Sequence, residues 1–253
     1  MNNRTFLIVV FLLSLVGTAQ AEGDDISITL ELEYWSRWLS KGASLYGQQS
    51  VFFPTIDLDF FGTGLGTRVT HRSAFGSGYV DEQRFEYRPY YRSILFGDQS
   101  YATYYNISAG YEHYYGLSPS SSNTSWEWIF AFSWPNIMPE GIVPSYIAHY
   151  EYPAANSGAD IGSGWAHRFI LGYDLQTPQI PEPLHLSSEV AYSDGIIGSD
   201  HDWAYATFGI STRFDIAENM AFVPGVYQQI TMDRSINQNK DITYCILSLK
   251  YKF

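Results

Sequence analysis

Apolar and polar residues alternate along much of this chain with a period of two, which is typical of β-strands that have one apolar and one polar face. The last segment shows this pattern most clearly. Its apolar face holds Leu247, Leu249, Tyr251 and Phe253, and its polar face holds Ser248, Lys250 and Lys252. A strand with these two faces can separate lipid from water. A strand of a soluble β-sandwich could show the same alternation.

About twelve segments have this strand-like pattern, and we find no convincing helical period of 3.6 residues. The clearest segments are 26–38, 51–60, 65–73, 84–95, 101–114, 126–134, 165–175, 203–214 and 242–253. Weaker candidates are 144–152, 184–192 and 220–231. Counts of ten and fourteen strands remain open alternatives.

The links between these segments alternate in character. If the N-terminus is periplasmic, the odd-numbered links are outer loops rich in Gly, Ser, Asn and Asp, whereas several even-numbered links, such as 62–64 and 97–98, are tight turns. Backbone N–H and C=O groups cannot stay unpaired in hydrocarbon, so the strands must close on themselves. We therefore predict an all-β fold, a single transmembrane antiparallel β-barrel of about twelve strands.

The N-terminus has the features of an export signal. Arg4 supplies a positive charge, residues 6–16 form an apolar core, and Ala19-Gln20-Ala21 fits the small-x-small cleavage pattern. We predict that residues 1–21 are a signal peptide that is removed and that residues 22–253 form the barrel.

The C-terminal strand resembles the signature by which bacterial outer-membrane barrels are recognised for assembly. The residues that carry this resemblance are the alternating apolar positions and the terminal Phe253. It implies that Tyr251 and Phe253 are read by the barrel-assembly machinery. It also implies a location in the outer membrane of a Gram-negative bacterium, in contact with lipid and lipopolysaccharide.

Composition agrees with a barrel and excludes two other classes. Aromatic residues make up 17% of the chain, with 21 Tyr and 7 Trp, which suits girdles at both edges of a membrane. The mean hydropathy of −0.15 excludes a helical membrane protein. The formal net charge of −12 argues against nucleic acid as a partner, because phosphate binding needs a basic surface. The single Cys245 has no partner for an intramolecular disulfide.

The hairpin around residues 62–64 predicts which face is the interior one. If Phe60 lies opposite Leu65, Asp57 lies opposite Arg68 and Ile56 opposite Val69, so charges pair with charges and apolar residues with apolar ones. Extending this parity gives a set of candidate pore-lining residues: Asp57, Asp59, Arg68, Arg72, Arg84, Glu86, Arg88, Arg92, Glu112 and Glu127. These charges could simply pair and fill a small barrel, or they could create a transverse field that orients solutes in a water-filled lumen. The two readings are compatible.

A second resemblance covers roughly residues 34–95. Ser36-Arg37-Trp38-Leu39-Ser40-Lys41-Gly42, the stretch 54–59 and the stretch 82–91 resemble the opening third of the TorF-type porins. That family typically has Arg-Gly where this chain has Lys41-Gly42. The resemblance implies a monomer-sized outer-membrane channel, and nucleoside-channel barrels are a vaguer likeness.

An enzyme is the main alternative. His71-Arg72-Ser73 has the His-x-Ser spacing of outer-membrane phospholipase A, in which both side chains share one strand face and the histidine can take the serine proton. The likeness fails after Ser73, where Ala74-Phe75 replaces the family's Asn-Gly, and no third residue that would orient the histidine can be assigned. The six histidines show no metal-binding spacing, so we predict no metal and no cofactor.

From the sequence we therefore predict an outer-membrane channel for passive diffusion of small hydrophilic solutes, without enzymatic activity. The alternatives are a lipid hydrolase that uses His71 and Ser73, and a non-conducting barrel whose outer loops bind a partner.

Overall fold

The structure is a computed structural model that describes residues 26–47, 49–74, 83–115, 124–155, 162–178, 180–196 and 199–253. The predicted signal peptide lies outside these residues. The long strands are β1 (Ile26–Trp35), β4 (Val51–Phe60), β5 (Leu65–Ala74), β6 (Gln83–Leu95), β7 (Thr103–Tyr115), β8 (Ser125–Ser133), β9 (Ile142–Pro153), β10 (Gly164–Thr177), β11 (Ile180–Asp194), β12 (His201–Thr212), β14 (Met220–Thr231) and β15 (Ile242–Lys252).

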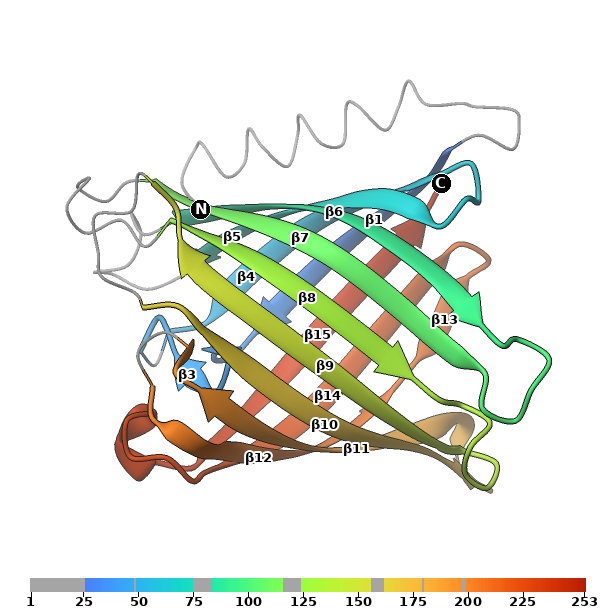
Figure 1. The fold of residues 1–253 in the computed structure, drawn as a ribbon. Coiled ribbons are helices and arrows are strands. Elements are labelled where there is room, and N and C mark those ends of the chain that lie inside the picture. The colour runs from blue at the N-terminus through green and yellow to red at the C-terminus, as the bar shows by residue number, and fades with distance from the viewer. Residues whose placement is uncertain are drawn as a thin grey trace.

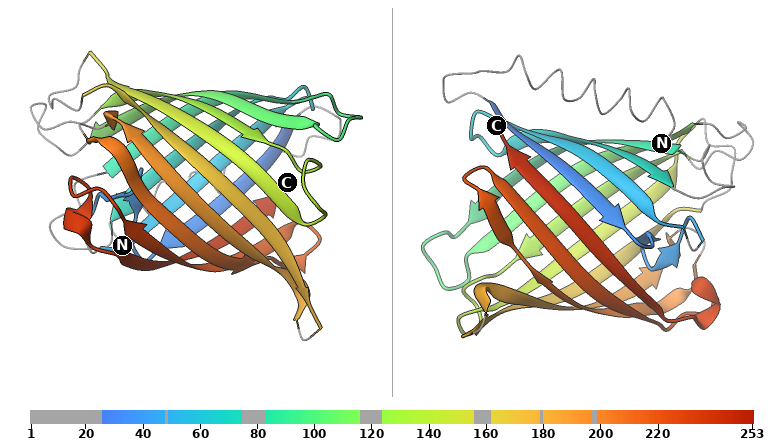
Figure 2. Two further views of the ribbon diagram at one scale, coloured as in Figure 1. Left: turned by 60° about the horizontal axis from the view of Figure 1, so that its bottom comes forward. Right: turned by 180° about the vertical axis from the view of Figure 1, so that it is seen from behind.

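These strands form one closed barrel (Figures 1 and 2). Each strand pairs antiparallel with its neighbours, and the pairings β1–β15 and β12–β14 close the ring. The short strand β13 (Phe214–Ala217) continues β12 beyond Arg213 and pairs with the same partner, β14. The prediction of a single antiparallel barrel of twelve strands is confirmed, and the three weaker segments are the strands β9, β11 and β14.

The strand register sorts the side chains onto two faces. Asp57 lies opposite Arg68, Ile56 opposite Val69 and Leu58 opposite Thr67, so the predicted hairpin register is confirmed. The outward face carries large exposed apolar and aromatic side chains, among them Tyr87, Trp126, Trp128, Phe169 and Phe208. An apolar surface of this kind is what lipid requires of a barrel exterior. In the described part of the chain, no helix has the length and apolar character to cross a membrane.

The first connection differs from the sequence prediction. The strand expected over 26–38 ends at Trp35, and the link that follows is not a plain loop. It contains a hairpin of two short strands, β2 (Leu39–Ser40) and β3 (Ala43–Ser44), joined by Lys41 and Gly42. Periodicity misses this hairpin because strands of two residues are too short to show a period.

Gly66 on β5 marks a place where the interior is closely packed. The ring of Tyr90 lies over it, and a Cβ added to Gly66 would lie 2.3 Å from that ring and 2.5 Å from the backbone oxygen of Leu58. The hydroxyl of Tyr90 donates a hydrogen bond of 2.6 Å to Asp57. The glycine thus makes room for an aromatic side chain that binds an interior carboxylate.

We predict that Gly66→Ala destabilises the barrel by about 1–3 kcal/mol, the usual range for overpacking. Urea unfolding in lipid vesicles, followed by tryptophan fluorescence, measures this change. Gly97→Ala is the matched control, because the nearest atom to an added Cβ there lies 3.6 Å away. Equal stability of the two variants would contradict the prediction.

Candidate functional site in the barrel interior

The strand register places all ten candidate pore-lining residues on the interior face. Several of them form rows of like charge across β5, β6 and β7. Arg72 lies opposite Arg84, and Arg68 lies opposite Arg88. Between these two rows, Glu86 lies opposite Glu112. Like charges directly opposite each other are destabilising, so the interior depends on attraction between the rows.

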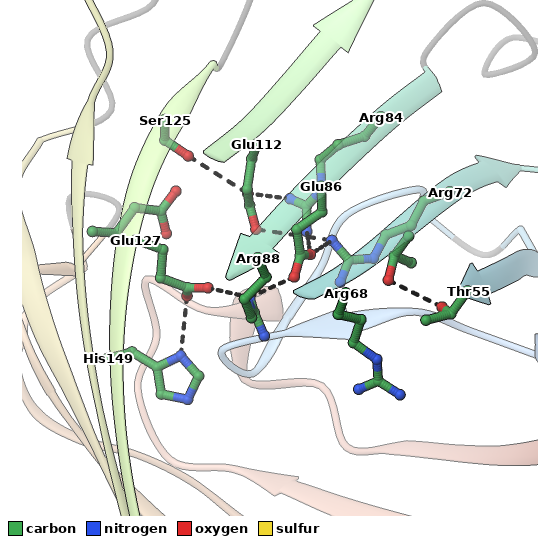
Figure 3. A network of polar contacts seen from close by, with 12 residues as sticks. Thr55, Arg68, Arg72, Arg84, Glu86, Arg88, Glu112, Ser125, Glu127 and His149 are labelled. Carbon is green, nitrogen blue, oxygen red and sulfur yellow. Dashed lines mark hydrogen bonds and ion pairs between the residues drawn. The ribbon is translucent and has the colours of Figure 1, made fainter. Parts of the chain in front are cut away.

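The ion pairs run along the diagonals between these rows (Figure 3). Arg84 Nη1 lies 2.6 Å from Glu112 Oε2, and Arg72 Nη1 lies 2.5 Å from Glu86 Oε2. Arg88 Nη2 bridges two carboxylates, with 2.6 Å to Glu86 Oε1 and 2.6 Å to Glu127 Oε2. Each arginine row is thus held by the glutamate row beside it.

An aromatic side chain covers the first arginine row. The guanidinium carbons of Arg72 and Arg84 lie 4.9 Å and 4.6 Å from the centre of a Trp38 ring. Arg84 also donates a hydrogen bond of 2.8 Å to the Tyr114 hydroxyl. Trp38 packs in turn against Tyr46 and Phe53 in a buried cluster. The loop after β1 therefore shields the arginine row from solvent.

The same loop adds a cation that the sequence analysis did not select. Lys41 Nζ lies 2.9 Å from Glu127 Oε1 and also forms an ion pair with Glu151 on β9. His149, also on β9, lies 3.0 Å from Glu127 through Nδ1. Burial alone would lower the pKa of Lys41, but the charges of Glu127, Glu151 and Glu112 raise it above its usual value. Lys41 is therefore charged at neutral pH.

This network is balanced in charge. Its cations are Lys41, Arg72, Arg84 and Arg88, and its anions are Glu86, Glu112, Glu127 and Glu151. The four carboxylates are at most 7% exposed. Such a cluster stabilises the wall through mutual pairing and leaves little net field for a solute.

Elsewhere in the interior, the cationic side chains are more exposed to solvent. Arg68 pairs with Glu31 at 2.5 Å and is 39% exposed, and Lys250 pairs with the same glutamate at 2.8 Å and is 42% exposed. Arg92 pairs with Asp59 and is 52% exposed. A cavity of 320 Å³ lies beside Arg68 and Lys250, and one of 720 Å³ lies beside Asp59 and Arg92. A polar solute could reach these cations.

The arginines of β5 and β6 pair with carboxylates on the same strand or on strands of the same wall, which include Glu31, Glu86, Glu112 and Glu127. The residues missed were Lys41, His149 and Glu151. His149 and Glu151 could have been found from the polar parity of β9, but the position of Lys41 depends on the fold of a loop.

His71 and Ser73 of the predicted hydrolase site lie on the outward face of β5, away from the charged network. Phe85 lies directly opposite His71, and the two ring centres are 4.8 Å apart. Ser73 pairs with Phe52 on β4.

Among the described residues, no group of three or more His, Cys, Asp or Glu side chains could hold a metal ion. Of the predicted outer loops, on which the partner-binding alternative depends, the segments 75–82, 116–123 and 156–161 lie outside the described residues.

No family model matches this chain, and a search of curated proteins finds no match. Solved structures do share its fold. The KdgM porin has a TM-score of 0.55 at 12% identity, over 89% of this chain and 99% of that porin. The NanC porin has a TM-score of 0.51 at 10% identity, over 88% and 98% of the two chains. An outer membrane channel from Pseudomonas putida F1 has a TM-score of 0.50 at 11% identity, over 94% and 98%. At these identities, the comparison shows that this chain shares the fold of these barrels.

We predict that Arg84→Met lowers the free energy of unfolding by about 3–5 kcal/mol, because it removes one of the two cations, Arg84 and Arg72, that pair with both buried Glu86 and buried Glu112. Urea titration in vesicles measures the loss, and Arg84→Met with Glu112→Gln should recover part of it. Arg92→Ser is the comparison, with an expected loss below about 1 kcal/mol because its ion pair is exposed. A similar loss of unfolding free energy in Arg84→Met and Arg92→Ser would show that the buried ion pairs stabilise the barrel no more than an exposed one.

Proposed function

We propose that this chain is a bacterial outer-membrane channel that passes small hydrophilic solutes by passive diffusion. The observation that carries the proposal is the combination of an apolar exterior with a charged interior that holds cavities. A barrel that served only as a scaffold could fill its interior with packed side chains. Here the half-exposed Arg68, Arg92 and Lys250 border cavities of 320 and 720 Å³.

The likeness to barrels described as porins and as an outer membrane channel supports this proposal. The full length of those barrels is matched, with 98–99% of each covered. It supports a location in the outer membrane for the same reason. The solute is a small polar molecule, because the larger cavity is bordered by the charged Asp59 and Arg92 and by the hydroxyl of Ser133.

Conductance in a planar bilayer tests the proposal. The purified, refolded barrel should give steady current steps, and Arg92→Ser should shift the reversal potential in a salt gradient toward cations, because a half-exposed positive charge is removed from the lumen. Arg234→Ser is the control, since it removes an exposed charge from a loop at the other end of the barrel. Absence of current under all conditions would refute the channel.

The C-terminal strand gives a prediction about assembly. Phe253 packs edge-on against Tyr251 with ring centres 4.4 Å apart, and its N–H donates a hydrogen bond of 2.9 Å to Ile28 O of β1. The residue thus lies at the seam where the first and last strands meet. We propose that Tyr251 and Phe253 are read by the barrel-assembly machinery.

We predict that deletion of Phe253 lowers the amount of folded barrel in outer membranes but leaves export across the inner membrane unchanged. Folded barrel is measured as the fraction that migrates differently on gels before and after heating. Deletion of an exposed loop residue, Arg234, is the control. Recovery of the intact chain as a soluble periplasmic protein would contradict both the assembly signal and the location.

A further inference from the structure

The hairpin of residues 39–44 reaches across the barrel. It leaves the wall at β1, yet its turn contacts β8 and β9 through Lys41, and β9 stands six places from β1 in the ring of strands. Figure 1 shows β3 at the end of the barrel opposite the C-terminus. The hairpin, Arg84, Glu127, Arg168 and Tyr205 line a cavity of only 220 Å³. Among the described residues, the hairpin therefore occupies the lumen at this end.

The turn residue Lys41 is an unfavourable choice for local structure. Both turn residues have positive φ, 51° at Lys41 and 86° at Gly42, as in a type I′ turn. Asn-Gly is the preferred pair for such a turn, because a residue with a long side chain is strained in the left-handed region. Observed strain of this kind points to a functional constraint on the residue. The constraint here is the contact that the lysine side chain makes.

Gly42 holds the turn against the far wall. An added Cβ would lie 2.3 Å from the Tyr205 ring, so only glycine allows this approach. The backbone oxygen of Gly42 accepts hydrogen bonds of 2.8 Å from Gln229 and 2.5 Å from Asn237. The N–H of Ser44 donates a further bond of 2.8 Å to Asn237 Oδ1. The hairpin is docked as a unit and is not merely folded over the opening.

Charge balance couples this docking to the wall. Without Lys41 the network has three arginines against four glutamates, and Glu151 has no other ion pair among the described residues. The lysine is only 8% exposed when docked. Its ion pairs with Glu127 and Glu151 thus complete the network and close the lumen at the same time.

We propose that the hairpin of residues 39–44 is the gate of this barrel and that Lys41 is the latch that holds it closed. The proposal rests on the channel function proposed above. When the Lys41 ion pairs break, the hairpin leaves the far wall and the lumen opens at this end. The gate is distinct from the arginine rows, which stay paired along the wall.

Lys41→Asn tests the latch directly, because asparagine suits the left-handed turn and removes only the cation. Two readouts are measured on the full refolded barrel. The first is single-channel conductance in a planar bilayer. The second is the labelling rate of Ala43→Cys by a water-soluble maleimide in a Cys245→Ser background, since Ala43 packs against the buried cluster of Ala191, Ala204, Tyr205 and Ile236 when the hairpin is docked. Lys240→Asn, an exposed loop lysine, is the matched control.

We expect Lys41→Asn to raise both the conductance and the labelling rate, the latter by about tenfold or more, which corresponds to about 1.4 kcal/mol of docking free energy. The control should change neither. If Lys41→Asn alone fails to fold, Lys41→Asn with Glu151→Gln keeps the charges balanced and should show the same rise.

The outcomes separate the gate from the channel. Unchanged labelling, or faster labelling with unchanged current through a conducting barrel, overturns the gate and leaves the channel in place. Faster labelling with no current in any variant refutes the channel function and, with it, a gate of that channel.

Discussion

The need to pair every backbone N–H and C=O group within the protein is the constraint on which the rest of this structure depends. In hydrocarbon these groups have no water to bind, so twelve strands close into a ring with no free edge. Closure fixes the strand register, and the register fixes which side chains enter the lumen. A shift by one residue would send Arg68 and Glu86 onto the apolar outer face and bring Val69 and Tyr87 inside. The charged interior is therefore a consequence of the same constraint that makes the barrel.

Once these charges are inside, they must satisfy one another. The register puts arginine opposite arginine and glutamate opposite glutamate, so neighbours in the same row repel. Contacts between the rows, such as Arg84 with Glu112 on the next strand and Arg88 with Glu86 on the same strand, compensate for this repulsion. The network is consequently cooperative, because loss of one row leaves its neighbour without partners. This explains why its carboxylates are buried although they face a lumen.

Much of this arrangement could be predicted from the sequence, because a period of two is a local property. The strands, the Asp57–Arg68 register and the parity of the arginines all follow from alternation. The direction of the ion pairs could not be predicted, since it depends on how neighbouring strands are staggered and on which rotamers reach along the wall. The role of Lys41 could not be predicted from the sequence for a different reason. Its partners Glu127 and Glu151 lie on strands distant in the sequence, and only the closed ring brings them within reach of the first loop.

The position of Lys41 also shows how local rules and function conflict in this barrel. Its backbone is in the left-handed region, where asparagine or glycine would be more stable, and its charge is taken out of water. Neither feature helps the hairpin to form. Both are compensated when the hairpin docks, because the lysine then supplies the fourth cation of a network that otherwise has an unpaired carboxylate. Docking of the loop therefore also completes the charge balance of the wall, and the lysine acts there together with the hydrogen bonds that Gly42 O accepts from Gln229 and Asn237.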